Sequence, residues 1–244
     1  MTAALNALQA HYDAMWADAF APISAGAVDV DPTLAPGADA RRGLTLIALP
    51  GAALAAQCQR VLDRLCGAEP DQFRYPSTDL HVTILSLVTV AVDSAPQLAR
   101  LDDYRAAVRA ALGACPTWEI AFDGITLSRG AVMARGMPHG PALETLRVRL
   151  RTELHARGLG ASLDRRYRLV TAHATLLRFV APLREPARFA ALLAGLRDVP
   201  LGSMRVDTLA LVINDWCMSG RSRSLVDTLA LAGPVSAPAL GEQA

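Results

Sequence analysis

The sequence predicts an α+β fold made of two similar lobes that face each other across a pseudo-two-fold axis. Three observations lead to this prediction. Strand-like and helix-like segments alternate along the chain. Two neighbouring strand-like segments are separated only by Ser128-Arg129-Gly130, which is typical of a hairpin. The same order of strands and helices also occurs twice along the chain. A mixture of strands and helices that includes a hairpin favours antiparallel pairing.

The first unit begins after an N-terminal extension. Residues 2–20 place apolar side chains on one helical face, and residues 22–42 lack any period and read as a loop. Hydrophobic runs and helix-ending glycines then predict the following elements. They are a strand at 44–49, a helix at 52–66, a loop at 71–79, a strand at 80–90, a helix at 96–112 and a strand at 118–127.

The second unit follows the same order. Its expected elements are a strand at 131–137, a helix at 141–157, a loop at 159–170, a strand at 171–180, a helix at 186–197 and a strand at 204–214. A last strand is expected at 224–231, and the tail 232–244 is expected to be disordered.

The repeat sets the expected domain organisation. Matching places in the two units are separated by 84 to 92 residues, as shown by Pro50 and Pro138, His81 and His173, and Asp123 and Asp207. We therefore expect an extension over 1–42, a duplicated domain over 43–231 with units of about 43–128 and 129–214, and the tail.

Composition narrows the function classes. The chain has 244 residues, is 52% hydrophobic and has a formal net charge of +1. This net charge gives no electrostatic argument for tight, nonspecific nucleic-acid binding, although it leaves room for a local basic cleft. All 24 basic residues are arginine, which excludes a P-loop or any covalent lysine adduct. The four cysteines show no metal-ligand spacing. The sequence shows no leader and no membrane-spanning run, so we expect a cytoplasmic protein. We also expect a monomer without a cofactor.

The repeated tripeptide is the strongest functional signal. His81-Val82-Thr83 and His173-Ala174-Thr175 both lie in apolar, strand-like runs. Positions i and i+2 of a strand share a face, so each tripeptide presents an imidazole beside a hydroxyl group. Two imidazoles can act as one acid and one base near neutral pH, and two hydroxyls can donate hydrogen bonds to an anion between them.

With both motifs and the order of elements around them, the chain resembles the 2H phosphoesterase superfamily, which includes bacterial 2′-5′ RNA ligases and RNA 2′,3′-cyclic phosphodiesterases. The resemblance covers about residues 43–231. It implies a bilobal fold with two mainly antiparallel sheets, helices outside and a central cleft lined by the motifs. It also implies that His81 and His173 are the acid and base, and that Thr83 and Thr175 contact the phosphate.

Other side chains are weaker candidates. Arg178 matches an arginine that family members often carry five residues after the second histidine. An odd spacing points it away from the cleft unless the strand bulges, so a structural salt bridge is an equal alternative. Tyr75 is a candidate for stacking on a base, with a packed loop aromatic as the simpler alternative. Arg147 and Arg151 share a helix face that is expected to be solvent-exposed.

The expected function is a metal-independent phosphodiesterase acting on 2′,3′-cyclic phosphates or 2′-5′ linkages, with an RNA end or a small cyclic nucleotide as substrate and no membrane partner. Three alternatives stay open. They are a reversible 2′-5′ RNA ligase with the same acid–base pair, a noncatalytic protein that binds a nucleotide or RNA end, and a pair of metal-binding histidines. The last is the weakest because threonine is a poor zinc ligand.

Overall fold

The computed structural model describes residues 3–31, 34, 39–165 and 167–233. The first half of the chain contains α1 Ala3–Ser24, β1 Arg42–Ala48, α2 Ala52–Ala68, β2 Phe73–Arg74, β3 Val82–Ala91, α3 Ala95–Leu98, α4 Leu101–Leu112 and β4 Trp118–Ser128. The second half contains β5 Ala131–Pro138, α5 Ala142–Ala156, β6 Ala174–Arg178, α6 Pro186–Leu196, β7 Pro200–Val206, β8 Thr208–Asn214 and β9 Ser224–Ala230. Short 3₁₀ turns lie at Ser77–Asp79 and Gly160–Ser162.

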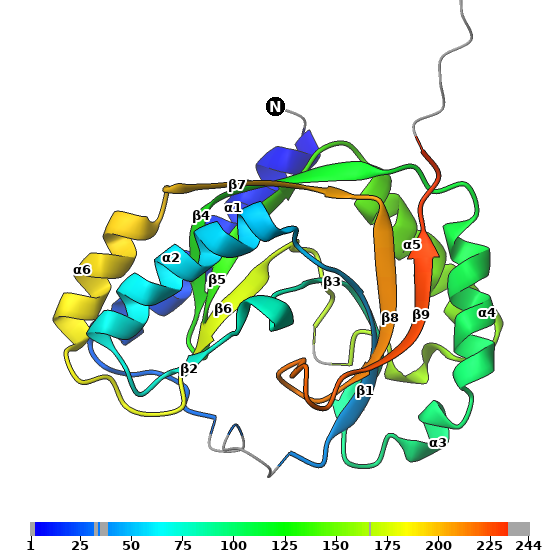
Figure 1. Cartoon of the computed structure of the whole chain (residues 1–244), viewed down its shortest axis with the longest axis horizontal. Coiled ribbons are helices and arrows are strands. Elements are labelled where there is room, and N and C mark those ends of the chain that lie inside the picture. The colour runs from blue at the N-terminus through cyan, green and yellow to red at the C-terminus, as the bar shows by residue number, and fades with distance from the viewer. Residues whose placement is uncertain (1–2, 32–33, 35–38, 166, 234–244) are drawn as a thin grey trace, which may run out of the picture.

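The strands form a curled antiparallel sheet of two halves (Figure 1). One half has the strand order β7-β4-β5-β6 and the other has the order β3-β1-β8-β9, while β2 pairs with β6. The halves join where β3 meets β6, at the pair of Val82 with Ala174. The α+β fold with two antiparallel halves is therefore confirmed.

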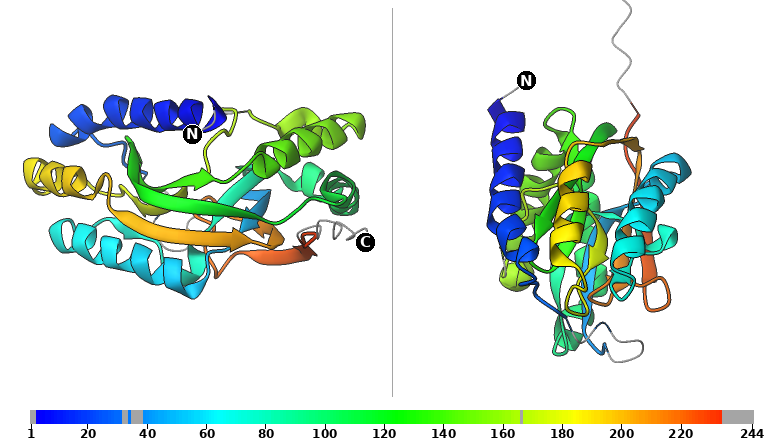
Figure 2. Two further views of the ribbon diagram at one scale, coloured as in Figure 1. Left: turned by 90° about the horizontal axis from the view of Figure 1, so that it is seen from above. Right: turned by 90° about the vertical axis from the view of Figure 1, so that its left-hand side faces the viewer.

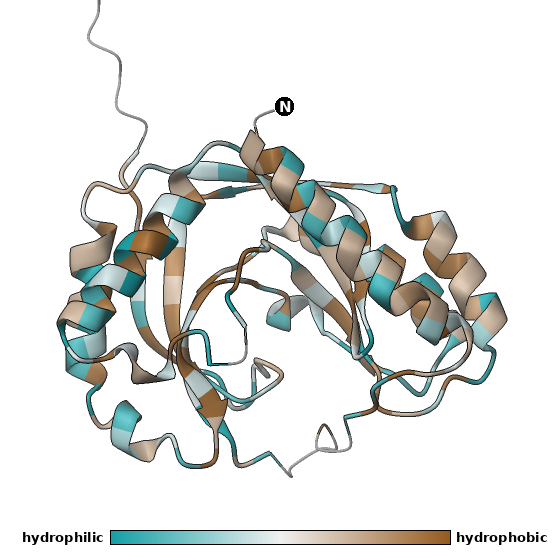
Figure 3. Ribbon diagram, turned by 180° about the vertical axis from the view of Figure 1, so that it is seen from behind, coloured by the Kyte–Doolittle hydropathy of each residue, from teal (hydrophilic) through white to brown (hydrophobic). Residues whose placement is uncertain are grey.

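Helices cover both halves. α1, α2 and α6 pack around the half that holds β4 and β7, and α4 packs on α5, which contacts β3. The left view of Figure 2 shows α1 and α2 on opposite sides of the strands. In Figure 3 the helices are banded with hydrophilic and hydrophobic residues. α4 follows this pattern, because Tyr104, Val108 and Ala111 are buried while Asp102 and Arg109 face solvent.

Several expected boundaries were wrong. The second motif strand is short, at 174–178 rather than 171–180, so His173 lies just before it, as His81 lies just before β3. The expected strand at 204–214 is two strands that break at Asp207 and belong to different halves of the sheet. The alternation shifts by one residue at this break, because Asp207 and Thr208 are both exposed between the buried Val206 and Leu209.

The termini also differ from expectation. α1 runs to Ser24 and so takes in the start of the expected loop. Ala232, at the start of the expected disordered tail, forms a bridge with Pro116, while 234–244 lie outside the described residues. None of the described helices combines the length and the apolar character needed to cross a bilayer. The division into an extension, a duplicated domain and a tail remains a prediction.

Candidate active site

The junction between the two halves of the sheet brings the motifs together. Val82 of β3 faces Ala174 of β6 in antiparallel register. Extending this register by one residue in each direction sets His81 opposite Thr175 and Thr83 opposite His173. The side chains of facing residues share one face of a sheet, so all four motif residues lie on the same face.

This face lines a pocket of about 180 Å³. His81, Thr83, His173 and Thr175 all contribute to its wall, together with Arg178. Both histidines are half-buried, and Thr175 is buried. Two imidazoles, two hydroxyls and one guanidinium therefore reach the same small volume, one imidazole and one hydroxyl coming from each half of the sheet.

Hydrogen bonds fix the orientation of both imidazoles. Nδ1 of His81 lies 2.8 Å from the backbone carbonyl oxygen of Asp79. A carbonyl oxygen only accepts, so Nδ1 carries a proton, and in the neutral ring Nε2 is left as the basic nitrogen. Nδ1 of His173 lies 2.7 Å from Oγ1 of Thr171, a hydroxyl group that can donate or accept. Among the described residues, neither ring takes a carboxylate as its hydrogen-bond partner.

Burial keeps both imidazoles neutral. Desolvation lowers the pKa of His81 to about 4 and the pKa of His173 to about 3. The positive charge of Arg178 lowers both values further, and His81 itself lowers the pKa of His173. A negative group placed between these residues offsets these charges, so an anionic ligand favours protonation of one ring.

A bulge in β6 brings Arg178 into the pocket. Its neighbour β5 pairs Val132 with Leu177 and the next residue, Met133, with Thr175, so β6 has one extra residue at this point. The extra residue reverses the alternation, and Arg178 faces the same side as His173 and Thr175. Among the described residues, no carboxylate forms an ion pair with Arg178, which leaves its charge available to an anion.

Tyr75 does not present a face for stacking. Its side chain is only 1% exposed, and its hydroxyl accepts a hydrogen bond from Nε of Arg178 at 3.0 Å. Its ring packs edge-on against Phe73 and lies 6.3 Å from the ring of His81. Of the two alternatives for Tyr75, the packed loop aromatic fits the structure, because this tyrosine is a buried support for Arg178.

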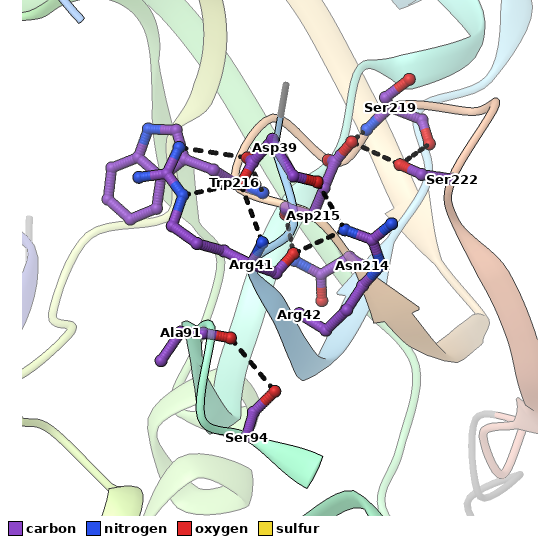
Figure 4. Close-up of polar contacts among 10 residues, drawn as sticks. All are labelled: Asp39, Arg41, Arg42, Ala91, Ser94, Asn214, Asp215, Trp216, Ser219 and Ser222. Atoms are coloured by element: carbon purple, nitrogen blue, oxygen red, sulfur yellow. Dashed lines mark hydrogen bonds and ion pairs between the residues drawn. The ribbon is translucent and has the colours of Figure 1, made fainter. Parts of the chain in front are cut away.

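A second support for Arg178 comes from the turn after β8. The guanidinium of Arg178 lies 5.3 Å from the ring centre of Trp216, which also lines the pocket. Figure 4 shows how this turn is held: the backbone N–H of Trp216 donates to Asp39, which also pairs with Arg41 at 2.7 Å. In the same turn, Asp215 accepts hydrogen bonds from the backbone of Ser219 and the hydroxyl of Ser222 (Figure 4).

Arg147 is buried rather than solvent-exposed. Its side chain is 1% exposed, and its guanidinium donates to four backbone carbonyl oxygens at 2.7 to 3.2 Å. These belong to Thr83 and Ile84 in the first motif strand and to Val170 and Thr171 before the second motif. Arg151 on the same helix face is also buried and pairs with Asp164 at 2.8 Å. The face shared by the two arginines packs against the motif segments, which spacing along one helix cannot reveal.

Several pocket residues were not predicted from the sequence. Thr45 and Asn214 come from strands β1 and β8, and Trp216 follows β8. Arg165 and Tyr167 belong to the loop before the second motif, and Tyr167 is 65% exposed. The one available signal was that this loop is rich in arginine. In the part of the chain that the structure describes, no three His, Cys, Asp or Glu side chains gather as metal ligands.

Comparison with known proteins reveals relatives in structure but not in sequence. No protein-family model matches the chain, and no curated protein matches it. Solved structures do match: E. coli LigT in apo form, at 18% identity and a TM-score of 0.51, covers 79% of this chain and 98% of its own. The chain has the LigT-like 2H phosphoesterase fold.

Two other structures share the LigT-like fold. The protein TT0787 of Thermus thermophilus has 16% identity and a TM-score of 0.51, and covers 80% of this chain and 99% of its own. ATU0111 of Agrobacterium tumefaciens has 17% identity and a TM-score of 0.57, and covers 87% of this chain and 97% of its own. The LigT-like fold is therefore matched over nearly the full length of each of these proteins, with this chain carrying additional residues.

Proposed function

We propose that this protein is a metal-independent phosphodiesterase that acts on 2′,3′-cyclic phosphates or 2′-5′ linkages of RNA ends or small nucleotides. The observation that carries the proposal is the convergence of two imidazoles, two hydroxyls and the guanidinium of Arg178 on one pocket. In-line displacement at phosphorus needs a base on one side and an acid on the other, and the two histidines come from opposite halves of the sheet.

The nucleotide substrate class has support from the neighbours. LigT has been crystallised with 3′-AMP, with NADP+ and with ATP, at TM-scores of 0.50 to 0.51 to this chain. A pocket of about 180 Å³ is small, and it suits a nucleotide or the end of an RNA strand better than a duplex. Arg178 supplies the positive charge that a phosphate group requires.

Each residue has a defined part in the proposed reaction. His173 removes a proton from water as the oxygen attacks phosphorus, and the bond to one ribose oxygen breaks. His81 donates its proton to that leaving oxygen, because its bond to the carbonyl of Asp79 stabilises the protonated ring. Thr83, Thr175 and Arg178 hold the phosphate oxygens while negative charge develops on them. The product is a phosphomonoester with a free neighbouring hydroxyl.

The test is a hydrolysis screen of 2′,3′-cyclic nucleotides and 2′-5′ dinucleotides, with and without EDTA. Wild-type protein should turn over at least one of them equally well in both conditions. His81→Ala and His173→Ala should each lose about 10²- to 10⁴-fold in turnover, as expected for removal of one positioned acid or base. His139→Ala, whose ring is exposed and outside the pocket, is the matched control and should keep full activity.

Other outcomes would identify the alternatives. Formation of 2′-5′ linkages from RNA ends would assign the reverse, ligase direction to the same residues. Nucleotide binding without turnover would assign a binding protein. Loss of turnover in EDTA that zinc or manganese restores would show that the histidines are metal ligands and would refute the proposed mechanism.

A further inference from the structure

Residues 169–173, which lead into the second motif, lack regular strand pairing. The ladder between β5 and β6 ends at the pair of Ala134 with Ala174. Continuing that register would place Gly136 opposite Ala172, immediately before His173. The conformation of His173 therefore depends on whatever holds this irregular segment.

The N-terminal helix α1 supplies one of the groups that hold it. The hydroxyl of Tyr12 donates to the carbonyl oxygen of Gly136 at 3.0 Å and accepts from the N–H of Ala172, also at 3.0 Å. One tyrosine hydroxyl therefore stands where a hydrogen bond between strands would otherwise form. The two strands are close here, because a Cβ atom on Gly136 would lie 2.0 Å from the carbonyl oxygen of Ala172.

The environment of Tyr12 suits this bridging role. Its side chain is 1% exposed, and burial raises its pKa to about 12, so the hydroxyl keeps the proton that it donates. The backbone carbonyl of Tyr12 accepts from the hydroxyl of Thr126 at 3.2 Å, which fixes α1 on β4. Just before Ala172, the guanidinium of Arg147 donates hydrogen bonds to the carbonyl oxygens of Val170 and Thr171. The backbone from 170 to 172 is thus secured by side chains from two different helices.

We propose that Tyr12 is a positioning residue for His173, so that the N-terminal helix contributes to the catalytic apparatus as well as to the fold. The proposal rests on the proposed function for its kinetic part. Tyr12 does not line the pocket, and it acts only through the backbone of Ala172. Without its hydroxyl, the N–H of Ala172 and the carbonyl of Gly136 lose their buried partner, and the segment before His173 is free to shift.

The test compares Tyr12→Phe with Tyr104→Phe. Tyr104 is a matched control because its side chain is also buried and its hydroxyl also donates to a backbone carbonyl, that of Leu159, outside the motif segments. Tyr12→Phe should lower kcat about 10-fold or more with KM changed less than about twofold, since small displacements of a reacting group have large kinetic effects. Tyr104→Phe should leave both constants near their wild-type values.

A spectroscopic measurement separates positioning from a general loss of stability. In an NMR titration, Tyr12→Phe should move the His173 ring signal and raise its pKa from about 3 towards the usual value, because a looser segment admits water. The His81 signal should move much less, since the backbone next to it is untouched. An unchanged kcat and His173 signal in folded Tyr12→Phe, or an equal loss in Tyr104→Phe, would overturn the proposal.

Two further results remain decisive if a variant or an assay fails. In wild-type protein the Ala172 amide should exchange with solvent slowly although it lies outside any strand, and fast exchange would overturn the proposal even if Tyr12→Phe does not fold. If wild-type protein hydrolyses none of the substrates, the proposed function fails. The His173 titration and the Ala172 exchange then still decide whether Tyr12 positions the histidine.

Discussion

The two neutral imidazoles should make the folded protein sensitive to mild acid. A histidine titrates near 6.5 in an unfolded chain, whereas the folded protein lowers the pKa of His81 to about 4 and that of His173 to about 3. Unfolding therefore takes up protons between these values. The stability that depends on the neutral rings is complete above pH 6.5 and is lost as the pH falls towards the folded-state values.

The size of the effect follows from the shifts. Between pH 8 and pH 5, each histidine should lower the free energy of unfolding by at most about 2 kcal/mol, or about 4 kcal/mol for the pair. Both rings are half-buried, so screening by solvent can only reduce this value.

The assay is urea unfolding of wild-type protein and of His81→Gln/His173→Gln at both pH values. Carboxylates that titrate in this range are shared by the two proteins, so their contribution cancels in the comparison. The double variant should lose less stability than wild type on acidification, and each single variant should recover about half of the difference. Equal losses in wild type and the double variant would refute the reasoning that burial holds both rings neutral.

Three further predictions concern other residues at the site. Arg147→Met should lower the free energy of unfolding by about 3 to 5 kcal/mol, because four backbone carbonyls lose a buried donor. Arg149→Met, on the exposed face of the same helix, should change this free energy by less than about 0.5 kcal/mol. Urea denaturation measures both values. Thr83→Ala and Thr175→Ala should lose less turnover than the histidine variants, because each removes one hydrogen bond to the phosphate and keeps the proton-transfer pair. Steady-state kinetics measure this, and a threonine variant as inactive as His81→Ala would contradict it. Arg178→Met should shift the alkaline limb of the kcat/KM profile to higher pH, because the charge of the Arg178 guanidinium lowers the pKa of both histidines. An unshifted alkaline limb would show that this charge does not act on the rings.

The sequence revealed the fold class and the motif pair because both depend on local patterns. Alternation along a strand is enough to put His81 beside Thr83, and the repeat suggests a second strand facing the first. The position of Arg178 was left open, because its orientation depends on a bulge that forms only when β6 pairs with β5. The sequence carries no mark of that extra residue.

Long-range contacts account for the residues that were misassigned. Arg147 has the spacing of an exposed helical arginine, yet it is buried because the motif strands present carbonyl oxygens that need donors. Tyr12 reads as one apolar residue of an amphipathic helix, and its hydroxyl acquires a function only through contact with Ala172, 160 residues away. In both cases the partner is a backbone group, which leaves no trace in the pattern of side chains.

The junction of the two half-sheets also bears on how such a protein can arise. Each half contributes one imidazole and one hydroxyl, and the halves meet at the antiparallel pair of Val82 with Ala174. A chain of half this length, carrying one motif, would be incomplete alone, but two copies related by a two-fold axis would place the same groups opposite each other. In this single chain the two histidines have different neighbours, the carbonyl of Asp79 for His81 and the hydroxyl of Thr171 for His173. A single chain can give the two imidazoles different hydrogen-bond partners before any ligand binds, whereas the copies of a symmetric dimer stay identical until a ligand breaks their symmetry.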